Sequence, residues 1–203
     1  MRIKSLHNTR LFLNLDLVFL GIISAGISLF QDRADLVLIV AWLVVALSVL
    51  ICRRYTSFLH LIISTSIAFL WVYGVRDYYG YNHSYYSLAG INLYPLTAWS
   101  LGLYGVSEIL NHFEIEKILI RLLIFILFFW TMLIFFETWA YHVIGIRNVS
   151  TGINAGLPFC NCIHAPLWMH IAYFSMGPVY YIITIYADRV FIFFFSRYQA
   201  GKQ

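Results

Sequence analysis

Long apolar stretches separated by short polar segments dominate the chain. Most of them approach the length of about 20 residues that a helix needs to cross the hydrocarbon core of a bilayer. Lipid offers the backbone no hydrogen-bond partners, so such stretches must be helical. The pattern predicts an all-α fold, a polytopic transmembrane helical bundle of about six spans. We place the spans at Leu11–Phe30, Leu36–Ile51, Phe58–Val75, Ile91–Leu110, Ile118–Phe136 and Ile163–Tyr186.

The segments between these spans are short, which bears on the domain organisation. A seventh apolar run, Val190–Phe195, is too short to span, and we expect it to lie at the membrane interface between Arg189 and Arg197. No stretch is long and polar enough for a separate soluble domain. We therefore expect residues 1–203 to form one integral membrane domain.

Composition and charge add an orientation. Hydrophobic residues make up 62% of the chain and charged residues only 11%. Lys and Arg collect on the cytoplasmic side of membrane proteins. Ten of the thirteen fall on one side of the predicted spans and three on the other, which puts both termini in the cytoplasm (N-in/C-in) of a multi-pass protein in a plasma or inner membrane. The net charge of +4 then faces anionic lipid, and no nucleic-acid partner is expected.

Two larger connections, after the third and fifth predicted spans, face outward in this topology. Both are rich in Tyr, Gly, Asn and His, and such loops often carry binding residues. The competing interpretation is an aromatic belt at the membrane interface, which the fifteen Tyr and six Trp of the chain would suit. The side chains that we expect to bind substrate are His83, His164, Tyr79, Tyr81, Trp99, Trp139 and Trp168.

Carboxylates and imidazoles on the same two connections are the candidates for chemistry. We expect Glu137, Asp77 and His142 to be catalytic, and to converge with His83 and His164 on one pocket at the outer boundary. Glu137 is the expected acid, because its aromatic neighbours would desolvate it, and an apolar environment favours the neutral form of a carboxylic acid. We expect no metal and no cofactor.

Three further polar features lie elsewhere. Asp16 falls deep inside the first span, where an unpaired carboxylate is costly, so we expect it to be buried with a polar partner such as Asn14, His60 or Arg10. A structural hydrogen bond and a proton-handling role remain open for it. Glu108 and His112 are four residues apart, and we expect them to form a pair on one face near the headgroups.

Cys160, Cys162 and His164 alternate along the second outer connection. If extended, they would share one side, and thiolate with imidazole suits zinc or cuprous copper. The spacing is not that of a CxxC site, so ordinary packing is the main expectation. A metal and a Cys160–Cys162 bridge are the alternatives.

Two segments resemble small membrane enzymes of carotenoid and terpene metabolism, namely the carotenoid hydratases and the membrane-bound lycopene and terpene cyclases. The first combines Tyr78–Tyr81 with Gly90–Trp99, and the second combines Glu137 with Gly156–Pro158 and Trp168. The Pro-Glu-Glu signature of lycopene cyclases is absent, because Leu and Thr follow Pro95. The resemblance implies protonation of an isoprenoid double bond by a carboxylic acid, with aromatic faces stabilising the carbocation.

Three functions follow from these features, in order of preference. The first is a metal-independent enzyme that modifies isoprenoids or lipids. The second is a structural or accessory subunit of a larger membrane complex, packed through the small residues Gly21, Ser24, Ala25 and Ser28. The third is a small-solute transporter, for which Asp16, Glu108 and Glu137 look too scattered along the sequence to form a path.

Overall fold

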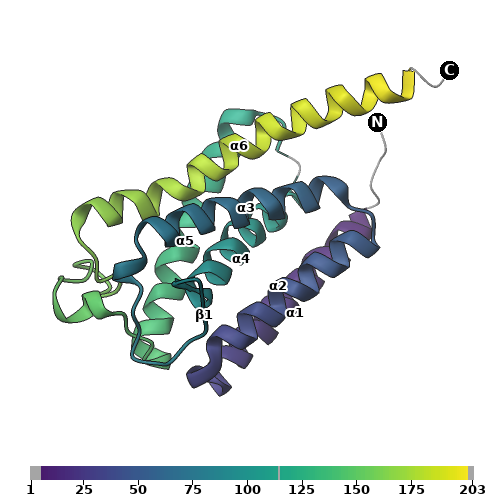
Figure 1. Ribbon diagram of the computed structural model, residues 1–203. Coiled ribbons are helices and arrows are strands. Elements are labelled where there is room, and N and C mark those ends of the chain that lie inside the picture. Colours follow the sequence, from purple (N-terminus) through teal and green to yellow (C-terminus); the bar gives the residue numbers. More distant parts are fainter. Residues whose placement is uncertain (1–5, 114, 201–203) are drawn as a thin grey trace.

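The computed structural model describes residues 6–113 and 115–200, with side chains at 15–113 and 115–191. Six α-helices run through this described part of the chain (Figure 1). They are α1 (Leu6–Leu29), α2 (Ala34–Ile51), α3 (Tyr55–Gly74), α4 (Leu93–Leu110), α5 (Ile118–Trp139) and α6 (Leu167–Ala200). The all-α prediction is confirmed for these residues, apart from one short hairpin.

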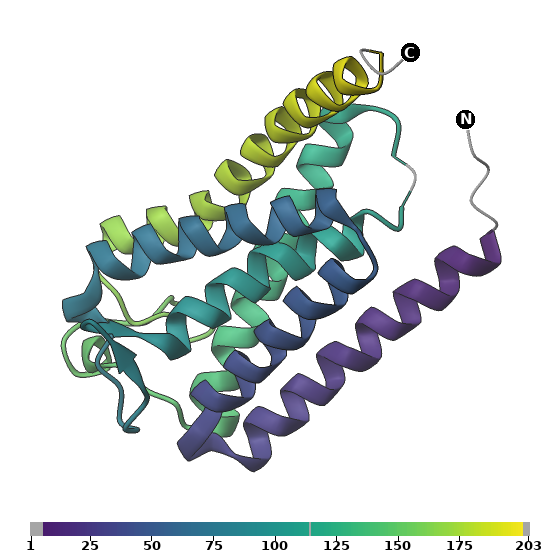
Figure 2. The same cartoon turned by 45° about the vertical axis from the view of Figure 1, so that its right-hand side comes forward.

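Successive helices run in opposite directions. Helix α1 begins and α6 ends at the same end of the bundle, together with the α2–α3 and α4–α5 connections (Figure 1). We call this the terminal end. The α1–α2, α3–α4 and α5–α6 connections gather at the opposite end, which we call the loop end (Figure 2). The two large connections expected to face one side therefore do lie together.

Among the described residues, three helical segments are long and apolar enough to cross a membrane: Gln31–Ile51, Tyr55–Gly74 and Ile118–Ile144. They support the membrane class of the protein. The last helix differs from its predicted bounds. It starts at Leu167, because Ile163 has a left-handed φ of 51° and the residue before Pro166 is held out of the helical region. It then runs on to Ala200, so the run at Val190–Phe195 continues this helix and is not a separate interfacial element.

Helix α4 is the centre of the bundle. Ten of its residues are buried, on several faces, and it packs against α2, α3 and α5. A hydroxyl cluster ties it to its neighbours: the Trp42 indole of α2 donates to Ser100 (3.1 Å) and to Thr65 of α3 (3.2 Å). The Thr65 and Ser100 hydroxyls lie 2.8 Å apart. Hydroxyl pairs of this kind hold helices together where water is scarce.

Helix α5 is the opposite case. Only Phe125 and Phe129 of its residues are buried, and most of its aliphatic surface is exposed. This distribution suits a helix at the lipid boundary, where exposed apolar side chains cost nothing. Its contact with α6 is close, because a Cβ placed on Gly177 would overlap the Phe129 ring. A glycine at this position lets the two helices approach.

The connections at the loop end are bonded to each other. A hairpin of β1 (Ser87–Leu88) and β2 (Ile91–Asn92) leads into α4, and its two-residue turn has positive φ at Ala89 and Gly90. Upstream of it, Tyr81 forms an antiparallel bridge with Asn148 of the α5–α6 connection. The Asn82 side chain donates to the Gly145 carbonyl and accepts from the Arg147 amide, each at 2.9 Å. We call this set of contacts the outer cap.

Candidate functional site

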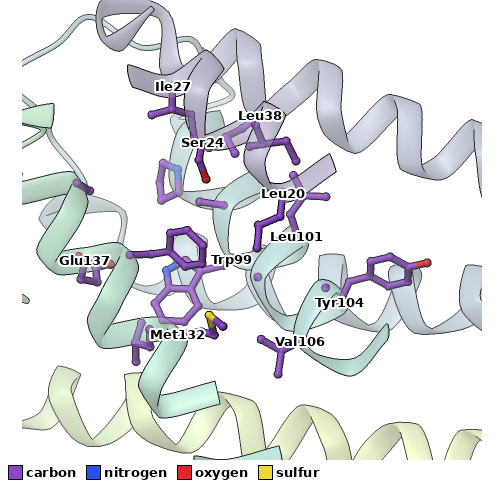
Figure 3. A pocket seen from close by; sticks show the side chains of 18 of the residues that line it. Leu20, Ser24, Ile27, Leu38, Trp99, Leu101, Tyr104, Val106, Met132 and Glu137 are labelled. Carbon is purple, nitrogen blue, oxygen red and sulfur yellow. The ribbon is translucent and has the colours of Figure 1, made fainter. Parts of the chain in front are cut away.

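A cavity of about 580 Å³ lies between α1, α2, α4 and α5 (Figure 3). It borders α4 from Tyr94 to Ile109, which corresponds to roughly 22 Å at the rise of an α-helix. Its middle is apolar, with Leu20, Leu101 and Met132 among the lining side chains. Polar groups line it near both ends. The shape and chemistry suit an elongated apolar ligand.

Aromatic side chains surround the cavity at the loop end. Of the seven predicted substrate-binding residues, Tyr79, Tyr81, Trp99, Trp139 and His164 line it. The rings pack on one another: Tyr81 is stacked on Tyr79, and Tyr94 meets Tyr81 edge to face. Aromatic faces in this arrangement present negative charge density, which attracts cations.

Glu137 faces this aromatic end of the cavity (Figure 3). It lies in the last turn of α5, and the close α5–α6 packing positions that helix. Its carboxyl group makes no hydrogen bond or ion pair with any side chain or backbone group of the described residues. Burial raises the pKa of the Tyr79 and Tyr81 hydroxyls, which line the same end of the cavity. The carboxyl group of Glu137 is therefore left free to meet a ligand.

The carboxylates nearest the terminal end are paired. Asp16 lines the cavity and lies 2.6 Å from the His112 ring nitrogen. Its expected polar partner exists, although it is none of the three residues proposed, and its side chain is 44% exposed rather than buried. Glu108 also lines the cavity and is bound by Arg54 at the start of α3. The expected Glu108–His112 pair is wrong, because α4 ends at Leu110 and His112 lies beyond the helix.

Three residues of the predicted outer pocket lie away from the cavity. Asp77 is at the surface beside Arg76, with a side chain that is 93% exposed. His83 pairs with Asp32 of the α1–α2 connection at 2.9 Å. His142 donates from Nε2 to the Cys160 carbonyl oxygen, 2.9 Å away. The expected convergence of five residues is therefore wrong for these three, and only Glu137 and His164 share the cavity.

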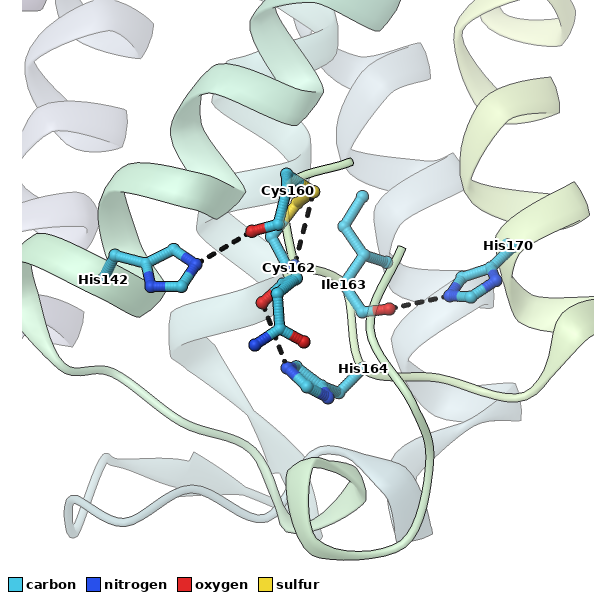
Figure 4. The surroundings of a disulfide bond; sticks show 7 residues. His142, Cys160, Cys162, Ile163, His164 and His170 are labelled. Atoms are coloured by element: carbon cyan, nitrogen blue, oxygen red, sulfur yellow. Dashed lines mark hydrogen bonds between the residues drawn. A yellow bond between two sulfur atoms is a disulfide. The ribbon is translucent and has the colours of Figure 1, made fainter. Parts of the chain in front are cut away.

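Histidines anchor the loop that closes the cavity at this end (Figure 4). His142 meets the Cys160 carbonyl, and His170 of α6 meets the Ile163 carbonyl at 2.7 Å. Both ring nitrogens of His164 face carbonyl oxygens, those of Asn154 at 2.9 Å and Asn161 at 3.2 Å. These imidazoles hold the loop through its backbone carbonyl groups.

Cys160 and Cys162 are joined by a disulfide in the same loop (Figure 4). Packing as free thiols, the main expectation, is therefore wrong here, and the bridge given as an alternative is present. Disulfide sulfurs cannot serve as thiolate ligands, which argues against the Cys160, Cys162 and His164 metal site. Within the described residues no group of three or more His, Cys, Asp or Glu side chains comes together as metal ligands would.

Trp168 is the remaining predicted binding residue. It is 48% exposed and meets Trp71 and Tyr78 edge to face, outside the cavity. Sequence reasoning missed Tyr94 and Tyr173, which do line the cavity. A signal existed, because each is a phenol inside an otherwise apolar helix and must place its hydroxyl near a polar partner.

No protein family, curated protein or solved structure matches the chain.

Proposed function

We propose that the protein is a multi-pass membrane enzyme that binds an elongated isoprenoid or related lipid in this cavity and transfers a proton to it from Glu137. The observation that carries the proposal is the unpaired carboxyl group of Glu137, which faces a large apolar cavity at its aromatic end. Six spans, cytoplasmic termini and a plasma or inner membrane belong to the same proposal. They are supported by the Lys/Arg distribution and by the antiparallel course of the six described helices.

The proposed step is the transfer of a proton from Glu137 to a carbon atom of the ligand. The π electrons of a ligand double bond form a new C–H bond with the carboxyl proton, the O–H bond of Glu137 breaks, and a carbocation remains. The faces of Tyr81, Trp99 and Trp139 stabilise this cation. Water then adds to it, or a second double bond of the ligand closes a ring. The proton lost at the end of either route returns to the Glu137 carboxylate. The proposed reaction uses no metal ion and no redox partner.

Solvent deuterium provides the test. The purified protein in lipid nanodiscs is incubated in D₂O with squalene or geranylgeraniol, and the recovered lipids are analysed by mass spectrometry. The wild type is expected to place deuterium on ligand carbon, since the transferred proton equilibrates with solvent. Glu137→Gln keeps the shape and lacks the proton, and we expect at least about a hundredfold loss of incorporation, the usual scale of general acid catalysis.

Glu116→Gln is the matched control. It is the same chemical change at an exposed position in the α4–α5 connection, and it should leave incorporation unchanged. Incorporation that persists in Glu137→Gln would show that another group is the acid. An absence of deuterium with the wild type and both lipids would remove the enzymatic proposal.

A transporter is the second candidate, because one observation favours it. The three acidic residues that look scattered along the sequence, Asp16, Glu108 and Glu137, all line this one cavity. The apolar middle of the cavity is unfavourable for a polar solute, which is why we rank this function second. Proton or solute flux into proteoliposomes that depends on Asp16 as well as Glu137 would reverse the order.

A further inference from the structure

Three hydrogen-bonding groups converge on the hydroxyl oxygen of Tyr79, beside the cavity. The indole nitrogen of Trp71 lies 2.7 Å from it and that of Trp99 lies 2.9 Å from it. The hydroxyl of Tyr173 is the third group, at 3.0 Å. All four side chains are buried or half-buried, so the protein, and not bulk water, sets the direction of these bonds.

The direction follows from the donors available. An indole N–H can only donate, so the Tyr79 oxygen accepts from both Trp71 and Trp99. A hydroxyl oxygen has two acceptor positions and one proton, and both acceptor positions are then occupied. The remaining contact must use the Tyr79 proton. Tyr79 therefore donates to Tyr173, and the two indole donors strengthen the hydrogen bond in this direction.

The proton of Tyr173 is consequently directed away from Tyr79. Among the described residues, no other group lies within hydrogen-bonding distance of the Tyr173 hydroxyl to accept it. Tyr173 lines the cavity at its aromatic end, and its ring packs on Trp99 with centroids 4.9 Å apart. A donor left without a partner in an apolar site is costly unless a ligand supplies the acceptor.

We infer that Tyr173 is a specificity-determining donor, and that the ligand carries an oxygen atom, such as a hydroxyl or carbonyl oxygen, at the end of the molecule that enters the loop end of the cavity. This inference rests on the proposed function, since it concerns the same ligand. The oxygen accepts from Tyr173 and lies on the side of the cavity that Glu137 also faces. We therefore expect an isoprenoid that carries an oxygen atom, and not a pure hydrocarbon.

Binding of a matched pair of lipids tests the inference. Phytol carries a terminal hydroxyl, and phytane is the saturated hydrocarbon with the same branched skeleton. Affinities are measured in nanodiscs from the change in tryptophan fluorescence, because Trp99 and Trp139 line the cavity. The wild type should prefer phytol by roughly two- to tenfold, the fold-change that one net hydrogen bond provides. Tyr173→Phe should remove the preference and leave phytane affinity unchanged.

Two further variants separate the hydrogen bond from a packing effect. Tyr181→Phe makes the same change in the same helix at a buried residue that stacks on Phe125, and it should keep the preference. Trp71→Phe lies outside the lining and frees one acceptor position on Tyr79, so the Tyr173 proton can turn back. We expect it to weaken the preference for phytol without touching the ligand, and this result stands even if Tyr173→Phe does not fold.

The possible outcomes distinguish the two proposals. Binding of both lipids with no preference, or a preference that survives Tyr173→Phe, would overturn the inference and leave the cavity proposal intact. If the wild type binds neither lipid, the isoprenoid cavity itself is wrong, and the inference falls with it.

Discussion

The two ends of the cavity use acidic residues in different ways. At the terminal end, Glu108 is paired with Arg54 and Asp16 with His112. At the loop end, Glu137 has tyrosine and tryptophan neighbours but no charged partner within the described part of the chain. Both ends contribute to the lining, and the middle of the cavity between them is apolar.

This difference separates structural acids from a candidate chemical acid. A paired carboxylate links two elements: Glu108 joins α4 to the start of α3, and Asp16 joins α1 to the segment after α4. An unpaired carboxyl group contributes nothing comparable to the fold, and leaving it so costs stability. Side chains that lower stability and link no structural elements are common at functional sites.

The largest effect that we predict is an all-or-none difference in the sidedness of the native cysteines. Cys52 is free and exposed in the α2–α3 connection at the terminal end, and the Cys160–Cys162 bridge lies at the loop end. Disulfides persist on the oxidising side of a membrane. In intact cells, a membrane-impermeant maleimide should label Cys160 only after an impermeant reductant, and Cys52 only after permeabilisation. Labelling of Cys52 from outside would invert the proposed topology.

The next effect compares two leucine substitutions. Glu108→Leu leaves Arg54 without its partner, and since that guanidinium is 52% exposed we expect a loss of only about 1–2 kcal/mol. Glu137→Leu removes an unpaired buried carboxyl group and should leave stability unchanged or raise it. Thermal unfolding of both variants in the same detergent provides the measurement. A larger loss for Glu137→Leu than for Glu108→Leu would mean that Glu137 has a structural partner.

The smallest effect concerns Asp16. Asp16→Asn keeps a hydrogen-bonding group for His112 and should leave the unfolding temperature nearly unchanged, whereas Asp16→Leu should lower it. Because the side chain is 44% exposed in the protein, we expect the leucine variant to lose less than Glu108→Leu. The same thermal measurement ranks the three leucine variants, Glu108→Leu, Glu137→Leu and Asp16→Leu, by unfolding temperature. An Asp16→Leu variant as stable as the wild type would show that the His112 contact does not anchor α1.

The helices could be predicted from the sequence and most of the contacts between them could not. Apolar runs located α2 to α5 within a few residues, because the hydrophobic pattern and the length of a membrane span are local properties. The start of α6 was missed because the φ of Ile163 depends on the loop around it. No feature of the sequence around Asp16 indicates that its partner is His112, which is 96 residues away in the chain.

The candidate site was predicted in part for the same reason. Position along a predicted span indicates one end of the bundle, and Glu137, Trp99 and Trp139 do line the same cavity. The direction of each side chain depends on helix rotation and on loop pairing. His83 pairs with Asp32, and His142 bonds to a backbone carbonyl. Both partners lie in other connections, and the hydrophobic pattern of the sequence does not predict which connections come together.

The outer cap has a consequence for how the protein is made. Its contacts join Tyr81 and Asn82 to residues 145–148, and α4 and α5 lie between them in the chain. During synthesis from the N-terminus, the second partner emerges only after both helices have been inserted. Until then the loop end of the nascent bundle is without its cover. On the proposed function, we expect a lipid ligand to enter during this interval and to be retained once the cap has closed.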